Sequence, residues 1–180
     1  MRLFLALIPP PSARRSLLGT MHALPGARWQ EDAQLHVTLR FVGDVDRHCA
    51  DALVLALRHE RFSKVEVRLD GFGFFDRRDR VDQLWASLAP REPLERLHAR
   101  LDRLCVSIGL EPEGRKYVPH ITLARFARST APSSAQLAGW LAAQPLLPSD
   151  PLVFDTLVLM ESRMGRDGSV YEPVFEVAMG

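Results

Sequence analysis

Two short apolar segments, each built around a histidine, constrain the fold of this chain more than any other feature of its sequence. One runs over residues 35–42 and the other over residues 118–125. Each has the length of a strand and follows a segment with helical character, at about 10–23 and 94–108 respectively. An order of helix and then histidine-bearing strand that occurs in both halves predicts two pseudo-equivalent lobes.

The remaining elements are predicted in mixed order. Strands are expected at 2–8, 65–69, 83–88, 152–160 and 170–177, and further helices at about 46–60 and 133–142. Such a mixture, without regular strand–helix–strand units, favours an α+β fold. We therefore predict a single bilobal domain over residues 1–180. Each pseudo-symmetric lobe would be a mainly antiparallel sheet with flanking helices, and a central cleft would carry the two histidine segments.

Local signals mark the ends and bends of these elements. Asp46 is predicted to cap the helix that follows it, and leucines spaced three or four residues apart give the helix at 94–108 one apolar face. The segment Gly71–Phe75 is expected to bend its strand or to let another backbone approach closely. Polar turns are predicted at 77–80 and 165–168.

Length and composition allow a sizeable core without covalent staples. The chain has 180 residues, of which 47% are apolar, so it can bury enough surface to fold alone. Its two cysteines, Cys49 and Cys105, lack the spacing of a disulfide framework or a zinc site, which suits a reducing compartment. The apolar run at 2–8 is short and ends at prolines, so it is predicted to be a buried strand and not a signal peptide.

Hydropathy and charge exclude two classes of function. No stretch reaches the length that spans a bilayer, so we expect a soluble, cytoplasmic protein that does not bind membranes. The net charge of +1 excludes the broad basic surface with which proteins grip long nucleic acids. A short oligonucleotide or a terminal nucleotide stays compatible with that charge.

The pattern that carries chemistry is His-x-Thr, present as His36-Val37-Thr38 and as His120-Ile121-Thr122. In a strand, residues two apart point to the same face. Each imidazole should therefore lie beside a hydroxyl, while the apolar residue between them points into the core. Chance pairing of the few histidines and threonines in the chain gives roughly 0.2 such motifs. The occurrence of two favours a shared function.

Two other interpretations compete with a catalytic one. A strand histidine is often only a hydrogen-bonded, partly buried residue; this is the better explanation for either motif alone, but not for the pair. A metal site would need a third protein ligand, and no histidine or carboxylate stands at a recognisable ligand spacing. We therefore expect neither a metal nor another cofactor. The remaining histidines are predicted to face solvent from helices or helix ends: His22, His48, His59 and His98.

Together with the residues around them, the motifs resemble the RNA 2′,3′-cyclic phosphodiesterases, also called the 2′-5′ RNA ligase family, of the 2H phosphoesterase superfamily. The similarity runs over nearly the whole chain. Its segments are Arg2–Leu7, Ala27–Trp29, Leu35–Asp44, Gly71–Phe75, Arg115–Arg125, Glu161–Ser162 and Gly168–Tyr171.

The resemblance implies a reaction in which water opens a 2′,3′-cyclic phosphate and leaves a 2′-phosphate. His36 would be the proton donor to the 3′ oxygen and His120 the proton acceptor; the sequence alone leaves this order open. Histidine suits both roles because its ordinary pKa is about 6.5. The hydroxyls of Thr38 and Thr122 would donate hydrogen bonds to the charge that develops on the non-bridging oxygens. No metal is required by this scheme.

The resemblance also implies substrate contacts from Arg125, Phe41 and Tyr117. Arg125 and Phe41 each stand five residues after a motif histidine, where strict alternation would turn them to the opposite face. They can act only if the strand twists, bulges or ends before them; otherwise Phe41 packs in the core and Arg125 is a surface charge. Tyr117 can stack on a base or close the core.

Three functions stay open at this point. The leading one is metal-independent hydrolysis of RNA 2′,3′-cyclic ends to 2′-phosphomonoesters by a monomeric enzyme, with 2′-5′ ligation as the reverse reaction. A related enzyme would act on small cyclic nucleotides or on 2′,5′-oligoadenylate. A non-catalytic module that binds RNA ends is disfavoured, because binding alone needs neither an acid nor a base.

Overall fold

The computed structural model describes residues 1–78, 80–165 and 168–180 and contains both helices and strands. The strands are β1 (Arg2–Leu7), β2 (Arg28–Trp29), β3 (Val37–Asp44), β4 (Val65–Asp76), β5 (Val81–Ala89), β6 (His120–Arg125), β7 (Leu152–Phe154), β8 (Thr156–Met164) and β9 (Ser169–Ala178). The helices are α1 (Pro11–Leu18), α2 (Arg47–His59), α3 (Glu92–Ser107) and α4 (Ser134–Ala143), with a short 3₁₀ turn at Asp32–Gln34. The predicted α+β class is confirmed.

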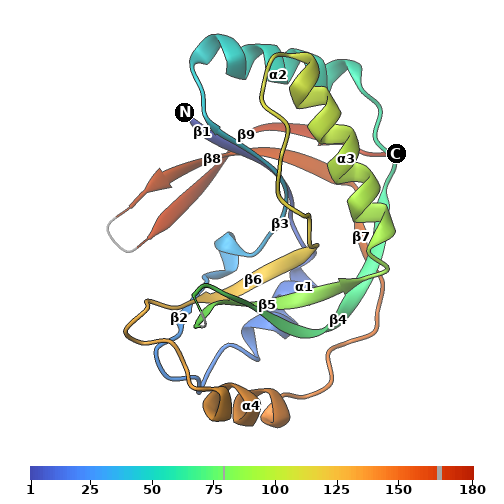
Figure 1. Cartoon of the computed structure of the whole chain (residues 1–180). Helices are drawn as coiled ribbons and strands as arrows, with labels where there is room; N and C mark the ends of the chain where they lie inside the picture. Colours follow the sequence, from blue (N-terminus) through green and yellow to red (C-terminus); the bar gives the residue numbers. More distant parts are fainter. Residues whose placement is uncertain (79, 166–167) are drawn as a thin grey trace.

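All strands belong to one antiparallel sheet. Its order is β7-β4-β5-β6-β3-β1-β8-β9, and β2 pairs with β6 beside this row. The sheet curls strongly, so that its two ends turn toward each other (Figure 1). The two predicted lobes are thus two halves of one continuous sheet, and they meet where Val37 of β3 pairs with Ile121 of β6.

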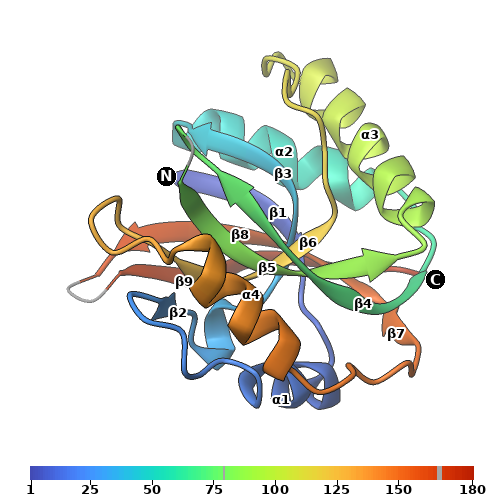
Figure 2. The same ribbon diagram turned by 60° about the horizontal axis from the view of Figure 1, so that its bottom comes forward.

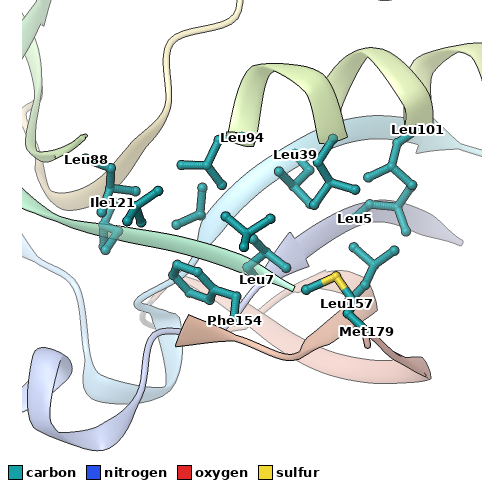
Figure 3. Packing of buried hydrophobic residues seen from close by; sticks show 14 of the residues in the cluster. Leu5, Leu7, Leu39, Leu88, Leu94, Leu101, Ile121, Phe154, Leu157 and Met179 are labelled. Carbon is teal, nitrogen blue, oxygen red and sulfur yellow. The ribbon is translucent and has the colours of Figure 1, made fainter. Parts of the chain in front are cut away.

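Helices α2 and α3 cover one face of the sheet (Figure 2), whereas α4 lies at the opposite end of the molecule (Figure 1). Leu5 and Leu39, from neighbouring strands, pack under Leu94 and Leu101 of α3 (Figure 3). All four are at most 1% exposed, and burying a leucine side chain contributes ~1.5–3 kcal/mol. The leucine spacing predicted for this helix therefore builds the main core.

Two helix starts follow from local sequence. The carboxylate of Asp46 accepts a hydrogen bond from the Cys49 amide at 2.8 Å, which caps α2 as predicted. Helix α4 begins with a reciprocal pair, in which Ser133 and Gln136 each accept a bond from the other's amide. Both caps satisfy amides that lack a partner within the first helical turn.

The glycine-rich segment bends β4 without ending it. The register of β4 on β5 shifts between Leu69 and Phe72, and Gly71 within that shift has a φ of +82°. A β-carbon on Gly73 would lie 2.2 Å from the ring of Trp85. The predicted bend is therefore present, and the close approach is made by an indole ring rather than by another backbone.

Other boundaries differ modestly from the prediction. Helix α1 ends at Leu18, because the chain beyond it turns through a bond from the Thr20 amide to the Leu17 carbonyl. Asp79, Arg166 and Asp167, which belong to the two predicted polar turns, lie outside the described residues. Among the described residues, no helix combines the length and the hydrophobicity that crossing a bilayer requires.

Candidate active site

The two motifs lie side by side on one face of the sheet. Val37 and Ile121, their central residues, face each other across β3 and β6, and both are fully buried in the core. The histidine and the threonine that flank each central residue therefore point to the opposite face. One pairing between neighbouring strands thus gathers all four predicted catalytic side chains on a single surface.

The His36 imidazole is held by its own strand and by two aromatic rings. Its Nδ1 lies 2.7 Å from the Gln34 carbonyl; a carbonyl only accepts, so Nδ1 carries the proton. Its Nε2 lies 3.0 Å from Oγ1 of Thr38. The rings of Phe4 and Tyr171 stand 5.0 Å and 5.1 Å from the imidazole. The ring is thereby fixed with Nε2 as its reactive atom.

The His120 imidazole is held by an equivalent arrangement. Its Nδ1 donates to the Val118 carbonyl at 2.7 Å, again two residues earlier in the chain. Phe75 packs edge-on at 5.0 Å and Trp85 lies at 5.8 Å. Within the described part of the chain, Nε2 has no hydrogen bond to Thr122. This Nε2 is therefore the less constrained of the two.

Burial and neighbouring charge disfavour protonation of both histidines. Burial lowers the pKa of His36 from 6.5 to about 4; the positive charges of His120 and Arg125 act in the same direction, and the Gln34 carbonyl acts against it. Burial also lowers the pKa of His120, with a further contribution from Arg125. Both imidazoles are neutral at neutral pH, and the two motifs are close enough for their charges to interact.

A bulge in β3 turns Phe41 back toward the motif face. The partners of Thr38 and Arg40 on β1 are consecutive residues, so Leu39 is an extra residue in β3. An extra residue inverts the alternation beyond it. Phe41 accordingly lies 6.2 Å from the ring of Phe4 and is 56% exposed. The alternative of core packing for Phe41 is excluded.

Strand β6 has a bulge at the equivalent position. The partners of Thr122 and Ala124 on β5 are consecutive, so Leu123 is an extra residue. Arg125 thus returns to the motif face, which agrees with the influence of its charge on the pKa of each motif histidine. Bulges at equivalent positions in the two motif strands remove the objection that strict alternation raised. Contact of Phe41 and Arg125 with a substrate stays a prediction.

Tyr117 packs beside the main core. Its ring stacks on His98 of α3 with centroids 4.2 Å apart and planes 4° apart. Its hydroxyl donates to the Thr38 carbonyl at 3.2 Å, and burial raises the pKa of Tyr117. Of the two roles considered for Tyr117, closing the core is the one that its contacts match.

His98 does not face solvent, which corrects one prediction. It is half-buried between Tyr117 and the strand below, and its Nδ1 donates to the Leu39 carbonyl at 2.7 Å. Periodicity places His98 beside the apolar face of α3, but it does not indicate that the β3 bulge leaves a carbonyl free there. The other three histidines outside the motifs are at least partly exposed: His22, His48 and His59.

A buried arginine ties α3 to the β3 bulge. Arg40 is 6% exposed, and its Nε donates to Oδ1 of Asp102 at 2.7 Å. Its remaining nitrogens donate to the carbonyls of Phe41 and Glu111 and approach the Glu113 carboxylate at 3.5 Å. Hydrogen bonds in several directions compensate the cost of burying this charge. The bulge is therefore braced from behind.

Sequence reasoning did not assign the aromatic rings around the two imidazoles. Phe4 lies in an uninterrupted apolar strand, where the hydropathy pattern does not distinguish a residue of the site from one of the core. Phe4, Phe75 and Tyr171 all lie in segments that carried the family resemblance, which was the available signal. Trp85 is marked only by the glycine that faces its ring.

The described residues contain no group of three or more histidine, cysteine, aspartate or glutamate side chains placed to hold a metal ion. The site thus consists of two tethered imidazoles, two hydroxyls and one guanidinium on a surface lined by aromatic rings. Such a set can take a proton at one Nε2 and deliver a proton from the other.

Comparison with known proteins identifies the family. The sequence model of the 2′-5′ RNA ligase superfamily matches residues 9–166. The chain belongs to this superfamily. It is similar to an RNA 2′,3′-cyclic phosphodiesterase of Aeropyrum pernix, with 30% identity over 82% of the chain and 83% of that protein. A Geobacillus stearothermophilus protein of the same name is 28% identical over 80% of the chain, which covers only 45% of that longer protein.

Solved structures share the fold. A Thermus thermophilus protein superposes with a TM-score of 0.79 over 99% of the chain and 98% of its own, at 23% identity. E. coli LigT, crystallised with 3′-AMP, gives 0.77 over 99% and 97%, at 24% identity. The predictions of the family and of an enzyme are confirmed: the chain is a phosphoesterase of the 2′-5′ RNA ligase superfamily.

Proposed function

We propose that the enzyme hydrolyses the 2′,3′-cyclic phosphate at RNA ends to a 2′-phosphomonoester. The observation that carries this proposal is the matched tethering of two imidazoles on one face. In each, Nδ1 is bonded to the carbonyl two residues earlier at 2.7 Å, which leaves Nε2 for chemistry. Relatives that carry the name RNA 2′,3′-cyclic phosphodiesterase support the choice of substrate.

In the proposed reaction, His120 is the base and His36 the acid. Nε2 of His120 takes a proton from the attacking water as its oxygen bonds to phosphorus. The bond from phosphorus to the 3′ oxygen breaks, and Nε2–H of His36 gives that oxygen a proton. The product keeps its phosphate on the 2′ oxygen. With a 5′-hydroxyl in place of the attacking water, the same steps join a 2′-5′ linkage, and run backward they cleave that linkage and restore the cyclic phosphate.

The negative charge that develops on the phosphate oxygens during the reaction is stabilised by hydrogen-bond donors. The hydroxyls of Thr38 and Thr122 lie on the motif face and supply one hydrogen bond each. Arg125 adds a positive charge on that face, where a guanidinium can bond two phosphate oxygens at once. Phe41, exposed at the equivalent position of the other motif, offers a ring for the base or the ribose.

Substrate binding has to change the protonation of His36. With a pKa of about 4 in the free enzyme, this imidazole is neutral at neutral pH and carries its one proton on Nδ1, so Nε2 has no proton to donate. A bound phosphate brings a negative charge, which raises the pKa of His36 and offsets the influence of Arg125. Substrate binding therefore favours the protonated form of His36, which is the form that acts as the acid.

The test is incubation with an oligonucleotide that ends in a 2′,3′-cyclic phosphate, in the presence of EDTA, followed by mapping of the product phosphate. We expect turnover that chelation does not reduce and a phosphate on the 2′ oxygen only. Turnover that EDTA abolishes and Mg²⁺ restores would falsify the metal-independent mechanism. A 3′-phosphate product would reverse the assignment of the leaving oxygen, and no turnover would reject the substrate.

A further inference from the structure

A second basic surface lies at the end of the strands that lead away from the motifs. It is a hollow formed where the turn between β4 and β5 meets the segment after β6; β6 runs toward it, and its antiparallel neighbour β5 begins there (Figure 1). Its lining residues are Arg77, Arg78, Arg80, Val81, Asp82, Phe126 and Arg128. None of these residues belongs to the candidate active site.

The hollow is held together by hydrogen bonds between its two sides. The Phe126 amide donates to the Asp82 carbonyl at 3.0 Å, and the guanidinium of Arg80 donates to the Arg128 carbonyl at 3.0 Å. Phe126 itself is 4% exposed and belongs to the apolar cluster under α4. The arginines thus project from a backbone that is tied down on both sides.

Charge in the hollow is strongly one-sided. Its described lining residues include four guanidiniums and one carboxylate, that of Asp82; Asp79, of the same turn, lies outside the described residues. The whole chain, by comparison, carries a net charge of only +1. Another hollow, lined by α3, differs: its Arg100 is paired with Glu60. Guanidiniums that line one hollow can bond phosphate oxygens, because their planar set of donors matches the geometry of a phosphate group.

The hollow and the active site are consecutive along β6. Arg125, on the motif face, directly precedes Phe126 in the wall of the hollow, and it pairs with Gln83 of β5. Five residues of strand at about 3.3 Å each separate Arg125 from His120. The hollow therefore lies on the order of 20 Å from the histidines, farther than one nucleotide reaches and within the span of a short oligonucleotide.

We propose that this hollow binds backbone phosphates of the RNA strand upstream of the reacting end. The inference rests on the proposed function for its substrate, and it defines that substrate as an oligonucleotide several nucleotides long. The proposal is compatible with the low net charge of the chain, because a small basic site can hold the end of a strand without binding long RNA along its length. Phosphate contacts of this kind position a strand and carry no sequence information.

The test uses the double variant Arg77→Gln/Arg128→Gln, which leaves the bond made by Arg80 in place. The matched control is Arg47→Gln/Arg103→Gln, which removes the same charge from exposed positions on α2 and α3. Each protein is assayed for binding of an RNA of about ten nucleotides with an ordinary 3′-hydroxyl, which requires no turnover. Each is also assayed for hydrolysis of that RNA with a 2′,3′-cyclic end and of a 2′,3′-cyclic mononucleotide.

We expect the hollow variant to bind the RNA about tenfold more weakly. The slope of the logarithm of its binding constant against the logarithm of the salt concentration should become less steep by about 0.7 for each phosphate that the protein no longer neutralises. Its kcat/KM should fall on the RNA and stay within about twofold on the mononucleotide. Unchanged RNA binding, or an equal loss in the control, would overturn the proposal. Absence of turnover in the unaltered enzyme would reject the proposed function instead, and the binding measurement would still decide on the hollow.

Discussion

The two motif strands use one backbone design and differ in what surrounds it. In both, the histidine Nδ1 donates to the carbonyl two residues earlier, and an extra residue three positions after the histidine restores the face for the residue at the fifth position. That fifth residue is Phe41 in one strand and Arg125 in the other. The backbone thus provides the symmetry, while the side chains divide the site into an aromatic end and a cationic end.

The immediate surroundings of the two imidazoles differ as well. Nε2 of His36 is bonded to Thr38, whose carbonyl in turn accepts a bond from Tyr117. No such chain of hydrogen bonds holds Nε2 of His120 among the described residues. A rigid Nε2 suits a proton donor that must be aimed at one oxygen, and a less constrained Nε2 suits a base that meets a mobile water. This contrast supports the proposed order of acid and base.

The largest expected effect comes from replacing either motif histidine, and the two variants should differ in their response to a better leaving group. His36→Ala and His120→Ala should each lower kcat/KM on a 2′,3′-cyclic end by about 10²- to 10⁴-fold, since each removes one proton transfer. A phosphodiester with an aryl leaving group, whose departing oxygen needs no proton, should partly rescue His36→Ala. The same substrate should leave His120→Ala as slow as before.

Steady-state kinetics on both substrates measure this contrast. Rescue of His120→Ala instead of His36→Ala would exchange the two roles, and near-normal activity of either variant would remove the paired mechanism. His59→Ala, an exposed position on α2, is the matched control and should retain full activity.

The second effect is a difference between the two threonines. Thr38→Ala and Thr122→Ala each remove a hydrogen-bond donor to the developing charge, so kcat should fall by about tenfold to a few hundredfold with KM less affected. Thr38→Ala should be the more damaging, because it also frees Nε2 of His36, which is 3.0 Å from this hydroxyl.

Threonine-to-serine variants at the same positions are the controls, since they keep the hydroxyl and should keep most of the activity. Equal losses in Thr38→Ala and Thr122→Ala would mean that the bond to His36 has no part in catalysis. The comparison between a rigid acid and a looser base would then lose its support.

Locally encoded features could be predicted from the sequence. The cap at Asp46 and the leucine spacing of α3 depend on residues within one or two helical turns, and both occur as predicted. The shared face of the two motifs also follows from local alternation, once β3 and β6 are neighbours. What the sequence could not provide was the sheet order, which places segments far apart in the chain around each imidazole.

The bulges show why alternation alone gave an incomplete site. Leu39 and Leu123 are apolar and buried, so they continue the pattern of a regular strand and give no sign of an extra residue. Arg40 would be read as a surface charge by the same rule, yet it is 6% exposed. Its partner Asp102 lies on a helix that only the tertiary fold brings near.

A smaller effect is expected from substitution of Gly73, and it concerns the surroundings of His120 alone. A β-carbon there would lie 2.2 Å from the Trp85 ring, so Gly73→Ala must displace the indole that packs beside His120. We expect a loss of roughly 1–3 kcal/mol in the free energy of unfolding and a fall in kcat of about tenfold. Chemical denaturation and kinetics measure the two losses.

Gly114→Ala is the matched control for this substitution, because a β-carbon there meets nothing within 4 Å. It should change neither stability nor kcat appreciably. If Gly73→Ala lost stability but kept full activity, the indole would support the fold without positioning His120. The aromatic rings around the two histidines would then not have equivalent roles.

The smallest effect links the lowered pKa of the motif histidines to stability. In the unfolded chain a histidine takes up a proton near its ordinary pKa of 6.5, whereas folded His36 does so only near pH 4. Between these values the unfolded state binds more protons, so stability rises with pH through this window and falls as the solution is acidified. Calorimetry above and within the window should therefore show the Tm of the unaltered enzyme falling on acidification.

His36→Gln should reduce that fall by about 3 °C, because glutamine cannot take up the proton that favours the unfolded chain. His120→Gln should act in the same direction, since the pKa of His120 is also lowered by burial, and exposed His59→Gln serves as the control. An acid-induced fall in Tm that persists undiminished in His36→Gln would mean that its imidazole is not the buried neutral group described above. A fall that only His120→Gln reduces would instead place the more desolvated imidazole at the cationic end of the site, where Arg125 already opposes protonation.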